Sequence, residues 1–215
     1  MQDYQINYCG GCTNCCVNLG KALLPGDEGV KIGLLDVLKL SSITTIKSKL
    51  FNFDLMLGEK QLAKISYSPG NIKAVLYYPC AALTNQGCLI HNRNVNDGLK
   101  EFINDYCLRN NIKPSPCDCY PSYVQDSWRW IDNLPINYCH NNRVLSDYEK
   151  KCLTNEMIVN AKLDDLPLII DYQLFKDLKN NNLSHALPLI KKLLDKDFGA
   201  FTKKIVPESL QSYLA

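Results

Sequence analysis

Apolar residues follow a helical spacing in three separate parts of the chain. In residues 33–42, leucine and valine side chains recur at intervals that predict a helix. A second helical pattern covers residues 97–110 and ends at two consecutive asparagines. From Asp147 onward the chain carries amphipathic segments, two of which are separated by the asparagines 180–182, and Ser184 is a candidate N-cap for the second. The C-terminal part is therefore predicted to be helical.

One short strand is predicted in the first half of the chain. The run Ala74–Tyr78 follows a Ser-Pro-Gly-Asn turn and stops at Pro79, which then leads directly into Cys80. Residues 43–68 fit a helical spacing, but their β-branched content favours strand, so both assignments stay open there.

These patterns predict a fold class that is mainly α, with few short strands and an irregular, metal-stapled, cysteine-rich core. A chain of 215 residues is long enough for one good core. We divide it into a cysteine-cluster metal-binding domain, residues 1–125, and a helical C-terminal region, residues 126–215, that packs on it.

Charge and hydropathy exclude several partners. The chain has 24 Lys and Arg against 22 Asp and Glu, a formal charge of +2, so no strong field attracts nucleic acid or anionic lipid. The first residues lack the basic and apolar regions of a secretory signal, and the longest apolar runs fall far short of the roughly 20 residues of a membrane helix. We expect a cytoplasmic protein with no nucleic-acid partner and no membrane span.

Eleven cysteines are the strongest anomaly of the composition, because thiols at this density in a reducing compartment usually bind metal or do redox chemistry. Four of them, in the pattern C-x2-C-x2-C-C, are Cys9, Cys12, Cys15 and Cys16. A tight loop of this kind aims several sulfurs at one centre, as metal–thiolate bonding requires. The odd count, and the strain of pairing adjacent cysteines, argue against a disulfide framework.

Further ligands must come from elsewhere in the chain. The candidates lie beside proline or glycine, the residues of rigid turns, and they are Cys80, Cys88, Cys117 and Cys119. Cys107 and Cys152 fall on predicted helices and are expected to be small buried residues. Cys139 with His140 is a weaker candidate.

The spacing indicates metal without choosing which one. The first three cysteines match the opening of the bacterial ferredoxin run, but Cys16 comes where three intervening residues are usual. A zinc ribbon needs a second CxxC, and none is present. An iron–sulfur cluster and zinc both remain candidate cofactors.

The chain resembles the CxxCxxCC cysteine-cluster family, the YkgJ-like proteins to which zinc or iron chelation is ascribed. The opening cluster, Cys9 to Cys16, matches fully, and the predicted helix at 33–40 resembles the family's short helix. Pro79–Leu83 matches its P-C-x-x-L segment, Gly87–His91 resembles its G-x-C-x-I-Y segment, and Lys113–Pro121 is similar to its closing R-P-x-x-C-R-x-F-P. This resemblance implies metal binding more firmly than any activity.

The chain also departs from that family. Residues 91–112 intervene where the family has only a few, and His91 stands where tyrosine is usual. Lys113 and Asp118 replace arginines. The cysteine clusters of flagellin lysine methylases are similar too, but residues 147–215 contain no nucleotide-binding pattern.

Three functions are compatible with these features. The first is a non-enzymatic protein in which an iron–sulfur cluster or zinc contributes to folding and the helices pack on the core or on a protein partner. The second is a metal-dependent, protein-modifying, methylase-like enzyme. The third is a thiol redox or metal-delivery protein. Lys21, Arg93 or Lys113 would offset the negative charge of a thiolate site, and the sequence assigns no catalytic residue.

Overall fold

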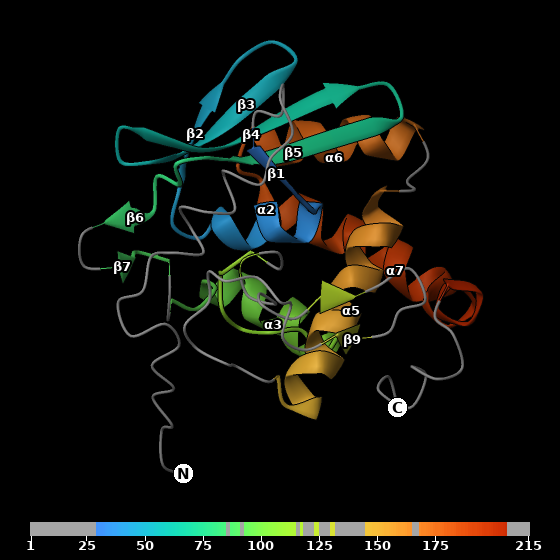
Figure 1. Ribbon diagram of the computed structural model, residues 1–215. Coiled ribbons are helices and arrows are strands. Elements are labelled where there is room, and N and C mark those ends of the chain that lie inside the picture. Colours follow the sequence, from blue (N-terminus) through green and yellow to red (C-terminus); the bar gives the residue numbers. More distant parts are fainter. Residues whose placement is uncertain are drawn as a thin grey trace.

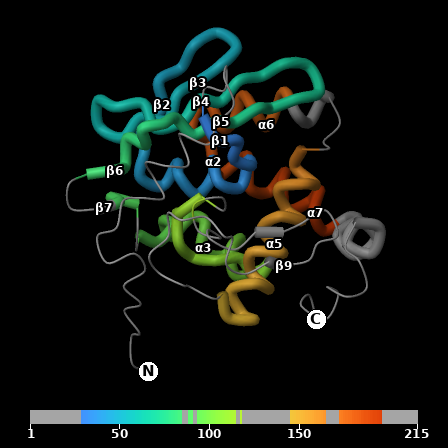
Figure 2. Tube along the Cα trace, in the orientation of Figure 1, coloured from blue at the N-terminus to red at the C-terminus, as the bar shows by residue number. Residues whose placement is uncertain are grey.

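The protein consists of an antiparallel sheet covered by helices in a computed structural model (Figures 1 and 2). The structure describes residues 29–84, 87–90, 93–114, 117, 123–124, 130–131, 145–164 and 168–205. The strands of the sheet are β1 (Gly29–Ile32), β2 (Thr45–Ser48), β3 (Asn52–Leu57), β4 (Lys60–Ser68) and β5 (Asn71–Tyr77), in the spatial order β1-β5-β4-β3-β2.

The helices and two short strand pairs complete the described elements. The helices are α2 (Leu34–Leu40), α3 (Asp97–Asp105), α5 (Asp147–Asp164), α6 (Leu168–Lys179) and α7 (Leu183–Ile205). The pairs are β6 (Leu83–Thr84) with β7 (Gly87–Cys88), and β8 (Tyr123–Val124) with β9 (Trp130–Ile131).

The sheet has one apolar face and one largely polar face, as alternating residues on antiparallel strands allow. Phe53 pairs with Ile65, and Ile65 pairs with Ala74, so three buried side chains from neighbouring strands share the apolar face. Leu62 is an extra residue opposite the Leu55–Met56 step, and this β-bulge lets Leu62 and Ala63 both be buried.

The predicted fold class is wrong in its balance of helix and strand. Residues 43–68, left open between the two, supply β2, β3 and β4, and with β1 and β5 they form a five-stranded sheet instead of a few short strands. Apolar spacing alone did not separate the alternatives, because the bulge interrupts the period of two within β4. The described core is a cluster of apolar side chains that extends from Ile32 to Leu194.

Helix α6 packs against the apolar face through aromatic rings. The ring centroid of Phe175 lies 5.6 Å from that of Phe53 and 5.1 Å from that of Tyr67. Aromatic pairs at this separation stabilise beyond their buried area. Strand β5 contacts both α6 and α2, and α2 also contacts α5 (Figure 1).

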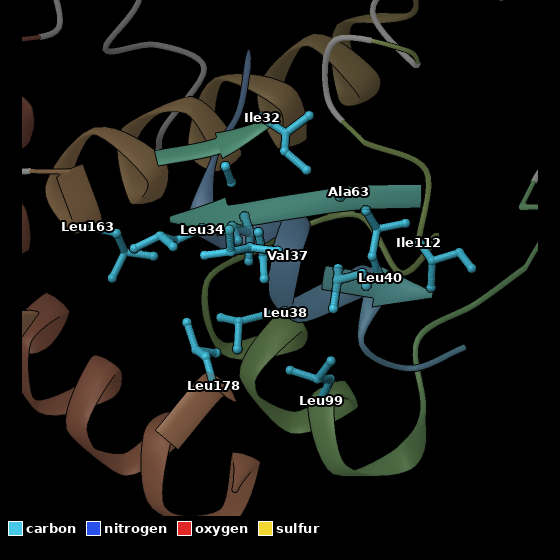
Figure 3. Packing of buried hydrophobic residues seen from close by; sticks show 14 of the residues in the cluster. Ile32, Leu34, Val37, Leu38, Leu40, Ala63, Leu99, Ile112, Leu163 and Leu178 are labelled. Atoms are coloured by element: carbon cyan, nitrogen blue, oxygen red, sulfur yellow. The ribbon is translucent and has the colours of Figure 1, made fainter. Parts of the chain in front are cut away.

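Helix α2 is enclosed on all sides, and each of its seven residues is buried. Side chains from the sheet and from three other helices surround it in Figure 3, where the labelled neighbours include Ala63, Leu99, Leu163 and Leu178. The N–H groups at its start, which have no partner within the helix, are satisfied by side chains of the fold. The Asp36 Oδ2 atom accepts from the Gly33 N–H at 3.0 Å, and the Asn160 Oδ1 atom accepts from the Leu35 N–H at 2.8 Å.

Several predicted elements are confirmed. The helix at 33–42 is α2, the strand at 74–78 is the end of β5, and the chain after Asp147 is helical in α5, α6 and α7. The helix at 97–110 is shorter than predicted and ends at Asp105, because Cys107 takes a left-handed φ of 50°.

The predicted N-cap of α7 is wrong by two residues. Helix α7 already begins at Leu183, and the Asn182 carbonyl accepts from the His185 and Ala186 N–H groups at 3.2 and 3.0 Å. The Ser184 hydroxyl donates instead to the Asn182 side chain at 3.1 Å.

None of the helices in the described ranges combines the length and apolar content needed to cross a membrane. The boundary between residues 125 and 126 lies outside the described residues, so the two-domain division stays a prediction. The apolar core includes side chains from both sides of that boundary, among them Leu55 and Leu178.

Helix α5 approaches the start of α2 so closely that a methyl group added at Gly33 is expected to destabilise the fold. A Cβ atom at Gly33 would lie 2.1 Å from the Asn160 side chain, which caps the Leu35 N–H. We expect Gly33→Ala to lower the free energy of unfolding by about 2–4 kcal/mol, through overpacking and the loss of that buried hydrogen bond. Urea unfolding followed by circular dichroism measures this.

Gly98→Ala is the matched control, because its Cβ would meet only the Asn96 side chain at 3.6 Å, an ordinary contact. Alanine in helix α3 should leave stability unchanged or raise it by up to about 1 kcal/mol. Equal effects of the two substitutions would contradict the close packing at Gly33.

Candidate metal centre

Cys80 lies directly after the sheet, where the chain turns back on itself. Strand β5 ends at Tyr77, and the Cys80 carbonyl accepts from the Leu83 N–H at 2.9 Å. The Cys80 residue is buried and belongs to the apolar core. Its position is therefore fixed both by the tight turn and by core packing.

Cys88 returns to the same place on the small β6–β7 hairpin. Leu83 pairs with Cys88, and the Leu89 N–H donates to the Ala82 carbonyl at 2.8 Å (Figure 1). Cys88 is partly buried against the core that contains Cys80. These bonds join the two cysteines into one compact unit at the end of β5.

The pairing of β1 with β5 fixes the point at which the described part of the chain begins, after the N-terminal cysteines in the sequence. Gly29, the first described residue, pairs with Tyr77, the last residue of β5. Because the strands are antiparallel, the chain enters β1 beside the point where it leaves β5 toward Cys80. Gly29 therefore lies beside the end of β5, three residues before Cys80.

Residues 93–112 belong to the segment that distinguishes this chain from the family it resembles, and the two ends of this stretch are bonded to each other. Asn94 and Asn111 form an antiparallel bridge. The Asn110 carbonyl accepts from the Val95 N–H, and the Arg93 carbonyl accepts from the Ile112 N–H, both at 2.9 Å. Helix α3 is therefore an excursion whose two ends are bonded together, and the chain after Ile112 resumes beside the chain that follows Cys88.

Cys117 follows this bridge. Its N–H donates to the Pro114 carbonyl at 2.9 Å, which places it on a tight turn, and it packs partly buried against the same core as Cys80 and Cys88. The structure therefore positions Cys80, Cys88 and Cys117 on one core. Cys9, Cys12, Cys15, Cys16 and Cys119 lie outside the described residues, as do His91, Cys139 and His140.

The described cysteines supply only part of a metal site. Within the described ranges, no group of three Cys, His, Asp or Glu side chains is placed to hold a metal ion. The thiolate donor set suits zinc or iron–sulfur chemistry, but a complete site needs ligands from the N-terminal cluster or from Cys119. Ligation stays a prediction for all eight cysteines.

Two of the three basic residues expected to offset thiolate charge are at the base of the α3 excursion. Arg93 is exposed and Lys113 is partly buried, and the bond between Ile112 and Arg93 brings their segments together. Cys88 precedes and Cys117 follows them in the chain. Lys21 lies outside the described residues.

The sequence did not reveal a buried ionic group at the centre of the fold. The Glu156 carboxylate on α5 accepts from the Arg109 Nε and Nη2 atoms at 3.2 and 2.5 Å, from the Arg109 backbone N–H at 3.0 Å, and from Lys39 Nζ. Lys39 and Glu156 are fully buried, and Arg109 is 9% exposed. This group connects α2, α5 and the chain after α3.

Two cations facing one carboxylate explain the titration of the group. Burial alone would raise the pKa of Glu156, but Arg109 and Lys39 hold that pKa below its ordinary value. Burial lowers the pKa of Lys39, and Arg109 lowers it further, against the attraction of Glu156. Because these groups are enclosed, they have no access to a substrate, and their role is to hold the helices together.

A signal for this group was present in the sequence. Asp36 lies in the same helix as Lys39 and is 1% exposed. The stretch Leu34–Leu40 contains five apolar residues in seven, and its two charged residues, Asp36 and Lys39, are three apart and share one face. Charged residues in such a helix require buried partners.

Comparison of the chain with protein-family models, with curated proteins and with solved structures found no match. The resemblance to the CxxCxxCC family therefore depends on the quoted motifs alone.

Removing the shared carboxylate takes away the buried negative charge that both Lys39 and Arg109 contact. We expect Glu156→Gln to lower the free energy of unfolding by about 3–5 kcal/mol. Chemical denaturation at neutral pH measures the loss. The control is Glu59→Gln, because Glu59 lies exposed in the β3–β4 turn, and its effect should stay within about 0.5 kcal/mol. Similar stability of the two variants would contradict the role given to Glu156.

The same carboxylate predicts a pH dependence. Because its folded pKa lies below the ordinary 4.5, its contribution to stability is complete above that pH and is lost as the pH falls through the folded value. The difference in unfolding free energy between the wild type and Glu156→Gln should therefore shrink below about pH 4.5. Denaturation series at several pH values test this, and a difference that stays constant down to about pH 3 would contradict it.

Proposed function

We propose that this chain is a metal-binding protein that holds an iron–sulfur cluster or zinc. The ligands come from the set Cys9, Cys12, Cys15, Cys16, Cys80, Cys88, Cys117 and Cys119. One observation supports this proposal: Cys80, Cys88 and Cys117, which lie apart in the sequence, all contact the described apolar core. The Gly29–Tyr77 pair places the first described residue beside the end of β5, and the Leu83–Cys88 pair forms the hairpin that follows Cys80. The Asn94–Asn111 bridge joins the two ends of the segment between Cys88 and Cys117.

The local structure of the described candidates suits ligation. Cys80, Cys88 and Cys117 each lie in a tight turn or at the base of a hairpin, so their backbone is held before any metal binds. Ligands on such preorganised backbone bind metal without a large ordering cost. Arg93 and Lys113 would offset the net negative charge that several thiolates bring to one centre.

The metal-dependent enzyme and the thiol redox or delivery protein remain predictions from the sequence. No observation on the described residues specifically favours either of them, so we propose metal binding as the function. We propose a cytoplasmic location, and a protein partner is compatible with this function. Metal and sulfide analysis distinguishes an iron–sulfur cluster from zinc.

Anaerobic purification of the full chain, followed by metal and sulfide analysis and a visible absorption spectrum, tests the proposal. Iron with sulfide and a brown colour identifies a cluster, while a colourless protein with bound zinc identifies a zinc site. Protein that contains neither metal, although its thiols are reduced, would show that the proposal is wrong.

Single substitutions test which cysteines are ligands. We expect Cys88→Ser and Cys117→Ser to lower the metal content of purified protein by at least half, because removing one thiolate from a closed site weakens it severely. Cys107→Ser is the matched control, since Cys107 is also partly buried but is not among the predicted ligands. Circular dichroism confirms that each variant is folded, and equal metal content in all three variants would contradict the assignment.

A further inference from the structure

The thiols of Cys107 and Cys152, which the proposed metal centre does not use, lie against each other. Cys107 follows α3 in a left-handed conformation, and Cys152 is fully buried near the start of α5. The Cys152 side chain interacts with the side chains of Cys107 and Tyr148. Both thiols are free. Two cysteines that are far apart in the sequence thus form a pair of neighbouring thiols in the fold.

The contact is fixed by the backbone around it. The Asn155 Nδ2 atom donates to the carbonyls of Tyr106 and Cys107 at 3.3 and 3.4 Å. The Glu156 carboxylate accepts from the backbone N–H of Arg109 at 3.0 Å. Asn155 and Glu156 lie one helical turn beyond Cys152, so these bonds hold the Cys107 segment against that part of α5.

The two sulfurs differ in accessibility. Cys107 is partly exposed, whereas Cys152 is fully buried. Burial raises the pKa of the Cys152 thiol and keeps it protonated. A small solute therefore reaches the Cys107 sulfur first. The buried Cys152 sulfur can then react with the oxidised Cys107.

We propose that Cys107 and Cys152 form a reversible redox site that takes a hydroperoxide as its oxidant. The Cys107 sulfur attacks one peroxide oxygen, the O–O bond breaks, and water or an alcohol leaves, so that Cys107 becomes a sulfenic acid. The Cys152 sulfur then attacks the Cys107 sulfur and the S–O bond breaks. An S–S bond forms, and the hydroxyl leaves as water with the proton of Cys152. Two thiols are oxidised, one hydroperoxide is reduced, and a dithiol reductant reverses the change.

The disulfide would close a loop from residue 107 to residue 152. That loop contains Cys117, Cys119 and Cys139, so oxidation restrains the chain that supplies candidate ligands while using none of them. The inference does not rest on the proposed metal function, because the contact between the two thiols involves neither the N-terminal cluster nor the Cys80 hairpin.

Peptide mapping of the wild type tests the site without relying on any variant. The full chain, purified anaerobically with whatever metal it holds, is treated with one equivalent of hydrogen peroxide, alkylated and digested with trypsin under non-reducing conditions. Cys107 and Cys152 fall on separate tryptic peptides, residues 101–109 and 152–162, each with a single cysteine. We expect these two peptides to be recovered linked, and to separate after treatment with dithiothreitol.

Two further measurements complete the test. Cys107→Ser and Cys152→Ser should each abolish the linked pair, and oxidation should raise the melting temperature of the wild type by roughly 5 °C or more without raising that of Cys107→Ser. Recovery of both peptides in alkylated form while other cysteines have reacted would overturn the inference. So would a link from Cys107 to a different cysteine.

Discussion

Helix α2 lies inside the protein with a carboxylate and an ammonium group among its seven residues, and every polar atom it brings must find a partner there. Asp36 closes the first turn from within. The other polar groups of α2 find their partners on α5. The Glu156 carboxylate accepts a hydrogen bond from Lys39 Nζ, and the Asn160 side chain accepts one from the Leu35 N–H. Glu156 and Asn160 are four residues apart and so share one face of α5. The register between the two helices is thereby set by polar bonds as well as by apolar packing.

Glu156 extends this constraint to the candidate metal centre. It binds Arg109, and the next three residues return to the Asn94 segment, where they bond to the chain beyond Cys88. A shift of α5 would therefore be transmitted through Arg109 to the base of the α3 excursion. The turns that carry Cys88 and Cys117 are on the two sides of that base, so the buried charges support their spacing from a distance.

The elements that the sequence predicted correctly are those set by short-range patterns of apolar and helix-breaking residues. The helix at 33–42, the strand that ends before Pro79 and the helices after Asp147 follow from apolar period and from Pro and Asn breakers. The sheet was missed because the bulge at Leu62 breaks the alternation of β4 and because a buried strand and a buried helix share apolar content. For the site, the sequence named the cysteines, but it could not show that residues 91–112 return to their starting point, since that depends on the Asn94–Asn111 bridge.

The strand order also has a consequence for the sequence of folding events. Strands β2 to β5 are consecutive antiparallel neighbours, so each pairing closes a short loop. Strand β1 must instead pair across the whole of that meander, Gly29 with Tyr77, and it can do so only after β5 is in place. We expect the meander to form early and β1 to dock late. Gly29 comes to lie beside the end of β5, near Cys80, only at that late step. Capture of a metal by cysteines that precede and follow the sheet in the sequence would therefore be among the last events of folding.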